Sequence, residues 1–216
     1  MTREIVLKTL TLLILSLATV PVSAQTDSRS KVILDKSVAK IKSYPAVEVI
    51  FDLTMENLEE NIRDTHAGKA HIKDQMYKIE IMGVVNYFDG ETIYEYNPDV
   101  EEVNVKSPEE NQEELMNPTI LFDIHNQKFN QQLIEEKGGK AYIELTPKTP
   151  HKQITKIGVW INTGNDAVEK VTSFGKDGNN VIITIKSLKK PAEELDVTFF
   201  QFDTKAHPNV EIVDLR

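Results

Sequence analysis

Apolar and polar residues alternate along most of the chain, a pattern typical of β-strands with one buried face and one exposed face. The clearest case is residues 47–55, where every second residue is apolar. The same period of two recurs in residues 77–81, 85–87, 93–96, 103–105, 141–145, 157–161, 181–185, 197–202 and 210–213. We therefore expect about ten strands.

Short turn signals separate several of these strands. Asp89-Gly90, Gly138-Gly139, Thr163-Gly164-Asn165 and Asp177-Gly178-Asn179 contain the residues that tolerate the positive φ of hairpin turns. Short connections between neighbouring strands mean antiparallel pairing. So many strands in one chain favour a strongly curled sheet, either a half-barrel or a barrel.

Three segments depart from this alternation and predict helices. Residues 27–43 place Leu34, Val38 and Ile41 on one helical face, with Asp27 or Ser28 as the N-cap and Tyr44-Pro45 as the end. The glutamate-rich residues 108–116 predict a second, short helix.

The third predicted helix begins at Asn117-Pro118, an N-cap followed by a proline that suits the first turn. Ile120, Leu121, Phe122 and Ile124 crowd its next two turns. A helix that is apolar around most of its circumference must be covered by other parts of the protein.

The N-terminus has the features of an export signal. Arg3 and Lys8 precede an apolar stretch over residues 10–20, and Val22-Ser23-Ala24 is the small-residue pattern at which signal peptidase cuts. We expect cleavage after Ala24 and a periplasmic protein, because the stretch is too short to span a membrane. The chain has no cysteine, so we expect neither N-terminal lipidation nor disulfides.

Residues 25–216 are enough for one domain with a substantial core, and we expect a single domain and a monomer. The whole chain has a formal net charge of −9. The predicted leader is slightly basic, so the mature protein is more acidic still. This charge argues against nucleic acid and against anionic membrane surfaces as partners.

The sequence offers no recognisable catalytic or metal site. It contains no Gly-x-Ser-x-Gly motif and no phosphate-binding glycine loop. The five histidines lack metal-ligand spacing, and we expect all of them to be surface or edge residues; His66 and His71 should point to opposite faces of one strand. We interpret the acidic residues between 101 and 114 as a solvated surface, and we expect no metal, no cofactor and no enzyme activity.

Apolar side chains fall on both sides of the segments at 181–183 and 197–202, so both faces of the sheet need cover there. One cover would be the helices. The other would be either more of the protein's own core or a bound ligand, and periodicity alone favours the core.

A longer motif carries a family resemblance. Residues 87–98 read YFDGETIYEYNP and are followed by Val100-Glu101-Glu102-Val103. This resembles a segment of the periplasmic outer-membrane lipoprotein carriers, the LolA family. The resemblance extends through the first helix and Phe51 upstream, and through Asn117-Pro118, residues 145–148, 200–202 and 208–214 downstream.

The resemblance implies an incomplete antiparallel β-barrel with a helical lid over its concave face. Acyl chains of lipoproteins would bind in a hydrophobic cavity between sheet and lid. The implied function is to carry lipoproteins from the inner to the outer membrane, with loading by an ATP-driven inner-membrane release complex and delivery to an outer-membrane acceptor whose identity is unknown. In the family an arginine latches the lid; the matching place here reads Lys73-Asp74-Gln75.

Candidate site residues follow from the alternation combined with the resemblance. The expected acyl-binding residues of the sheet are Val49, Phe51, Leu53, Tyr77, Ile79, Ile81 and Tyr94. The expected lid residues are Leu34, Val38, Leu121, Phe122 and Ile124.

Two other functions are left open. One is a periplasmic module that senses lipids or lipoproteins, or transfers lipids, and signals to a membrane partner. The other is a secreted hydrolase, which would need an activated serine or a carboxylate pair that the sequence does not display.

Overall fold

The computed structural model describes residues 22–108 and 128–216. One long helix, α1 (Val22–Lys42), precedes the sheet, and a short 3-10 helix, η1 (Val197–Phe200), lies near the C-terminus. The strands are β1 (Val47–Asn57), β2 (Ile62–Lys73), β3 (Met76–Ile81), β4 (Val84–Phe88), β5 (Ile93–Asn97), β6 (Glu102–Lys106), β7 (Phe129–Lys137), β8 (Lys140–Pro147), β9 (Ile154–Asn162), β10 (Ala167–Gly175), β11 (Asn179–Lys189) and β12 (Glu211–Asp214).

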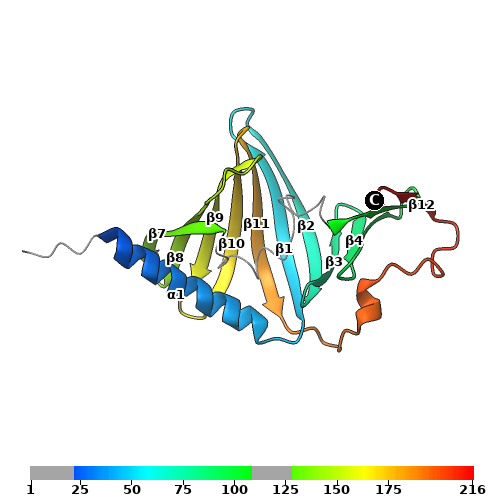
Figure 1. Cartoon of the computed structure of the whole chain (residues 1–216), viewed down its shortest axis with the longest axis horizontal. Helices are drawn as coiled ribbons and strands as arrows, with labels where there is room; N and C mark the ends of the chain where they lie inside the picture. Colours follow the sequence, from blue (N-terminus) through cyan, green and yellow to red (C-terminus); the bar gives the residue numbers. More distant parts are fainter. Residues whose placement is uncertain (1–21, 109–127) are drawn as a thin grey trace, which may run out of the picture.

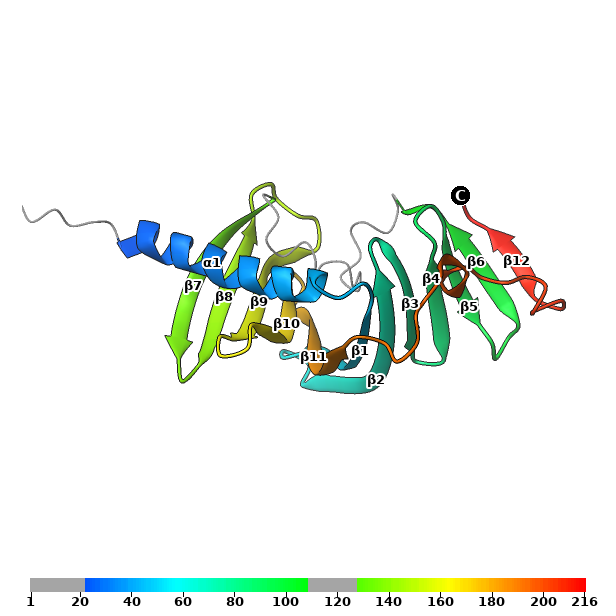
Figure 2. The same cartoon turned by 90° about the horizontal axis from the view of Figure 1, so that it is seen from below.

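All of these strands form one 12-stranded sheet in the order β12-β6-β5-β4-β3-β2-β1-β11-β10-β9-β8-β7 (Figure 1). Neighbours pair antiparallel, except that β12 runs parallel to β6. Because β7 and β12 are the two ends of the order, the sheet is unclosed. Figure 2 shows that the sheet is bent. The strands β7–β10 rise on one side of β11, β1 and β2, and the strands β3–β6 and β12 rise on the other side. This mainly β, curled and open sheet confirms the fold class expected from the sequence.

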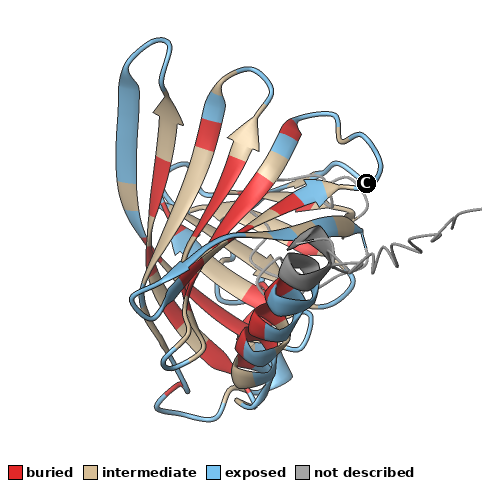
Figure 3. Cartoon of the chain, turned by 90° about the vertical axis from the view of Figure 1, so that its left-hand side faces the viewer, coloured by how far each residue is buried: buried red, intermediate tan, exposed pale blue. Residues whose placement is uncertain are grey.

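The sheet has two chemically different faces, which β1 defines. On the inner face lie Val47, Val49, Phe51 and Leu53, all buried. The outer face carries the residues between them, such as Glu48 and Asp52, which are only partly buried. The buried side chains of α1 and those of the inner face belong to one hydrophobic core, and Figure 3 shows buried positions on both elements.

The helix α1 lies against the inner face because its apolar residues repeat at helical spacing. It begins at Val22, earlier than the expected start near Asp27, and its last turn carries Lys40 and Lys42, whose charges suit a helix C-terminus. The helix packs chiefly against β7 and β10. Its buried residues are Ser30, Ile33, Leu34, Ser37, Val38 and Ile41.

Polar interactions hold α1 on the sheet near both ends of the surface that the helix and the sheet share. The guanidinium of Arg29 donates from Nε and Nη2 to the two carboxylate oxygens of Glu136 on β7, at 2.9 and 2.5 Å. Near the other end, Lys40 Nζ donates to the carbonyl oxygen of Asn165 in the turn between β9 and β10. The pairing raises the pKa of Arg29 and lowers that of Glu136.

One predicted strand is wrong. Residues 197–202 do not form a strand; Val197–Phe200 is the 3-10 helix η1. Asp196 causes the change, because its Oδ1 accepts hydrogen bonds from the backbone N–H groups of Thr198 and Phe199 at 2.8 and 3.2 Å. A side-chain cap of this kind satisfies the first N–H groups of a helix and competes with strand pairing.

Two strands, β7 and β10, were absent from the sequence prediction, and β2 was expected only as the strand that carries His66 and His71. The predicted helix at 117–124 and all but the first residue of the one at 108–116 lie outside the described residues. Among the helices that are described, none combines the length and the apolar character needed to cross a membrane.

Candidate functional site

The inner face carries a continuous band of apolar side chains that crosses the sheet from β8 to β3. Residues directly opposite in an antiparallel pair share a face. On β1, Val49 lies opposite Leu188 on one side and Ala70 on the other, and Ala70 in turn lies opposite Ile79. The band continues through Val171 on β10, Val159 on β9 and Ile143 on β8, which are at most 2 % exposed.

Six of the seven sheet residues proposed to contact acyl chains lie together on this band. Val49, Phe51 and Leu53 come from β1, and Tyr77, Ile79 and Ile81 come from β3. All except Ile79 are buried in this structure, and Ile79 packs half-buried against the same core.

Tyr94 lies on the opposite face of the sheet. The register places it in the row Glu48–His71–Lys78–Tyr87–Tyr94, which belongs to the outer face. Its ring stacks on Phe202, with centroids 6.1 Å apart. Tyr94 is therefore separated from the other six residues by the sheet itself, and Ile93, its neighbour, takes the inner-face position.

Phe88 is an inner-face aromatic that the sequence did not single out. It lies opposite Tyr77, and the two ring centroids are 5.3 Å apart. The YFDG motif contains both Tyr87 and Phe88, and only the hairpin register tells which of these two faces inward.

Two of the five lid candidates, Leu34 and Val38, lie on the side of α1 that faces the sheet, 0 % and 4 % exposed. The other three, Leu121, Phe122 and Ile124, lie outside the described residues. Because α1 packs chiefly on β7 and β10, it covers one half of the inner face, and the half formed by β1–β4 extends beyond it.

Polar side chains mark where the apolar band ends. Beyond Ile79, the same inner-face row continues through Asn86, Glu95 and Asn104 on β4, β5 and β6. The neighbouring row stays apolar through Phe88 and Ile93 and ends at Lys106, which makes an ion pair with Glu95 at 2.8 Å. The apolar part of the inner face therefore ends at β5 at the latest.

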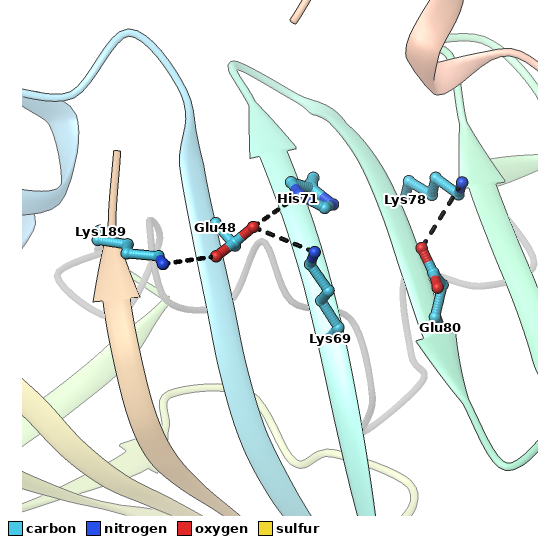
Figure 4. Close-up of polar contacts among 6 residues, drawn as sticks. All are labelled: Glu48, Lys69, His71, Lys78, Glu80 and Lys189. Atoms are coloured by element: carbon cyan, nitrogen blue, oxygen red, sulfur yellow. Dashed lines mark hydrogen bonds and ion pairs between the residues drawn. The ribbon is translucent and has the colours of Figure 1, made fainter. Parts of the chain in front are cut away.

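The outer face at β11, β1, β2 and β3 carries a charged network instead (Figure 4). Glu48 lies at its centre: its carboxylate oxygens are 3.1 Å from Lys69 Nζ, 3.2 Å from Lys189 Nζ and 3.3 Å from His71 Nε2. Hydrogen bonds from the two lysines hold the pKa of Glu48 at about 2. The carboxylate is ionised at any physiological pH.

His71 contradicts the expectation that every histidine is a surface or edge residue, because it is only 7 % exposed. It does point away from His66, as its strand parity predicted. Burial lowers the pKa of His71, Lys69 lowers it further, and the hydrogen bond to Glu48 opposes both. Its Nδ1 has no hydrogen-bond partner within residues 22–108 and 128–216.

The C-terminal segment after β11 covers this part of the outer face, and η1 packs against β3. Phe199 lies over His71, and Lys78 Nζ lies 5.1 Å from the ring centroid of Phe199. Further along, Phe202 packs against Tyr96 and His207. The outer face thus has a small aromatic core of its own.

Lys73 stands where the family resemblance implied a latching arginine. Its Nζ donates to the carbonyl oxygen of Leu195 at 2.6 Å, in the loop that leads into η1. In the described structure this lysine fastens the C-terminal segment across the outer face.

A metal site requires at least three acidic or histidine side chains that converge on one point. No such group exists in the part of the chain that the structure describes. Burial raises the pKa of Glu144, but hydrogen bonds from Lys156 and Tyr142 outweigh it and lower that pKa overall. Hydrogen bonds from Lys140 and Asn162 lower the pKa of Glu169 against the opposing effect of burial. These are features of structural ion pairs.

Solved structures resemble this fold at low sequence identity. A conserved uncharacterised protein from Thermus thermophilus has a TM-score of 0.55 at 8% identity, with 86% of this chain and 99% of that chain covered. A LolA superfamily protein from Nitrosomonas europaea has a TM-score of 0.46 at 14% identity, covering 80% and 97%. The lipoprotein LppX from Mycobacterium tuberculosis has a TM-score of 0.47 at 15% identity, covering 77% and 98%. The first of these supports the overall fold.

Comparison with curated proteins gives no match in sequence. The family model "Outer membrane lipoprotein carrier protein LolA" matches residues 84–203, which run from the start of β4 to just beyond η1 and make up more than half of the chain. The chain therefore belongs to the LolA family of outer membrane lipoprotein carrier proteins.

Proposed function

We propose that this protein is a periplasmic carrier that holds the acyl chains of lipoproteins against the inner face of its sheet. The observation that carries the proposal is the apolar band from β8 to β3, of which α1 covers only one half. No bond is made or broken in this function; the protein shields hydrocarbon from water between two membranes.

The size of the hydrophobic effect explains why such a carrier is needed. An acyl chain exposes on the order of fifteen methylenes, each of which costs about 0.8 kcal/mol in water. Non-covalent binding reaches only about −20 kcal/mol, so no protein competes with a bilayer for several chains at once. Loading therefore requires energy, and the partners are an ATP-driven release complex in the inner membrane and an acceptor in the outer membrane.

Binding requires the inner face to open. Phe51, Tyr77 and Ile81 are 8%, 7% and 6% exposed, so acyl chains reach them only after a movement that uncovers the β1–β4 half. The contact is apolar and only weakly directional. Such a site suits one kind of group, the acyl chain, on many different lipoproteins.

Binding of a fluorescent triacylated lipopeptide to the purified protein tests the proposal, with the same peptide without acyl chains as the negative probe. Ile79→Glu puts a charge on the half-buried inner face and should abolish binding, since a charge there opposes hydrocarbon. Ile50→Glu is the matched control: Ile50 is also half-buried, but it lies on the outer face of β1 opposite Lys69. Equal binding by the two folded variants would contradict the assignment.

Release from membranes tests the carrier role itself. Inner-membrane vesicles loaded with lipoprotein should yield a soluble complex when this protein and ATP are added, and none without ATP. Mass spectrometry of the protein purified from the periplasm should find acylated peptide. Free lipid alone would instead favour the sensing or lipid-transfer role.

A further inference from the structure

The ring of Phe51 lies across the backbone of Gly68. Gly68 on β2 is directly opposite Phe51 on β1 and Ile81 on β3, so all three share one inner-face row. A Cβ atom built on Gly68 would lie 2.5 Å from Cζ and 2.7 Å from Cε2 of Phe51, and 3.1 Å from Cδ1 of Ile81. The two distances to Phe51 are shorter than real Cβ contacts, so the ring occupies the place of the missing side chain.

The backbone does not require glycine at this position. Gly68 lies within β2 and is not among the residues with positive φ. A glycine inside a strand weakens the strand and often marks a close approach by another group. The contact with Phe51 is that close approach.

The orientation of the Phe51 ring affects the space above the sheet. Strand side chains ordinarily stand roughly perpendicular to the sheet. The Phe51 ring instead reaches across to β2, where its Cζ and Cε2 lie within 2.7 Å of the place that a Cβ of residue 68 would take. Any side chain at position 68 would push these atoms away from β2 and into the region in front of the inner face.

We infer that Gly68 is a specificity-determining position that sets how deep an acyl chain can lie on the inner face. The inference rests on the proposed function, and it concerns chain length. With glycine at position 68, the Phe51 ring lies close to the backbone of β2 and leaves the space in front of it free for an acyl chain. With a larger residue, the displaced ring would occupy the space that the last few methylenes of a long chain need.

The melting temperatures of four proteins test the contact between Phe51 and Gly68 without any ligand. The proteins are the wild type, Gly68→Ala, Phe51→Leu and the double variant. Alanine normally stabilises a position of this kind, because it restricts the unfolded chain. We expect Gly68→Ala to lower the melting temperature in the wild-type background and to leave it unchanged or raise it in the Phe51→Leu background. A stabilising Gly68→Ala in both backgrounds would overturn the inference.

Binding of lipopeptides with acyl chains of about eight to about sixteen carbons tests the consequence. Losing the burial of two methylenes weakens binding roughly tenfold. We expect Gly68→Ala to weaken binding of the longest chains by at least that factor, to leave the shortest chains unaffected, and to be rescued by Phe51→Leu.

Gly158→Ala is the matched control. Gly158 is also inside a strand, and a Cβ there would lie 3.0 Å from both Trp160 and Tyr142, but on the outer face. It should lower stability without changing the dependence on chain length. If the wild type binds no acyl chain, the proposed function fails; if the wild type binds and Gly68→Ala leaves the chain-length dependence unchanged, only the role of Gly68 fails.

Discussion

The imidazole of His71 lies edge-on to the ring of Phe199, with centroids 5.0 Å apart and planes inclined at 80°. His71 belongs to the sheet and Phe199 to the C-terminal segment, so this contact joins the two. Around the imidazole, Glu48 on β1 and Glu80 on β3 are the carboxylates, Lys69 on β2 is the lysine whose charge lowers the pKa of His71, and Lys78, opposite His71 on β3, lies over Phe199. From η1, the ring of Phe199 packs against the histidine.

Acidification should therefore loosen the C-terminal segment. The folded-state pKa of His71 is below its ordinary value of 6.5, because burial and Lys69 disfavour the charged form. Between these two pKa values the unfolded protein binds more protons, so stability falls as the pH drops through 6.5 toward the folded pKa. Urea unfolding at several pH values, with hydrogen exchange at η1, measures this.

The control for the pH effect is His66, which is more exposed and pairs with Asp64. His71→Asn should remove most of the loss of stability between about pH 7 and the folded pKa, whereas His66→Asn should retain it. An unchanged pH profile in His71→Asn would show that other groups cause the acid sensitivity.

Glu48 should contribute stability over a different pH range. Its pKa is lowered from 4.5 to about 2, so its contribution is complete above pH 4.5 and is lost as the pH falls toward 2. Its lysine partners are 41% and 62% exposed, which screens the interaction. We expect Glu48→Gln to cost about 1 kcal/mol at neutral pH.

The salt dependence of the Glu48 variant checks the cause. Electrostatic pairs near the surface weaken as ionic strength rises. The stability difference between wild type and Glu48→Gln should shrink in high salt and disappear near pH 2. A difference that is independent of both would indicate lost packing instead.

The sequence predicted the two faces of β1 because every second residue from Val47 to Leu53 is apolar. It could not predict the face of Tyr94. That face depends on the registers of the β3–β4 and β4–β5 hairpins, and a change of one residue in either turn would reverse it. The sequence also could not predict that His71 is buried, because Phe199, which packs against it, is far away in the sequence.

The missed strands have weak alternation. In β10 the register shifts between Val168 and Lys170, and this bulge interrupts the period of two. At the edge of the sheet, β7 reads FNQQLIEEK and is mostly polar. Charged side chains on edge strands of this kind prevent pairing with other chains. Such strands therefore lack a clear alternation of apolar and polar residues.

Phe200 should anchor the C-terminal segment. It is 0% exposed, whereas Val197 at the other end of η1 is 53% exposed. Truncating a fully buried phenylalanine costs about 3–5 kcal/mol, so Phe200→Ala should lower the free energy of unfolding by roughly that amount. Val197→Ala should change it by no more than about 0.5 kcal/mol. Similar costs for the two variants in urea unfolding would contradict the packing of η1.

Leu34 should be the principal anchor of α1 on the inner face. It is 0% exposed, and Val32 on the same helix is 45% exposed. Leu34→Ala leaves a cavity between helix and sheet and should cost about 2–5 kcal/mol, whereas Val32→Ala should cost no more than about 0.5 kcal/mol. Trp160 on β9, the single tryptophan, reports unfolding by fluorescence. If Leu34→Ala proved as stable as Val32→Ala, α1 would not be packed on the sheet in solution, and the half of the inner face under it would also be open to acyl chains.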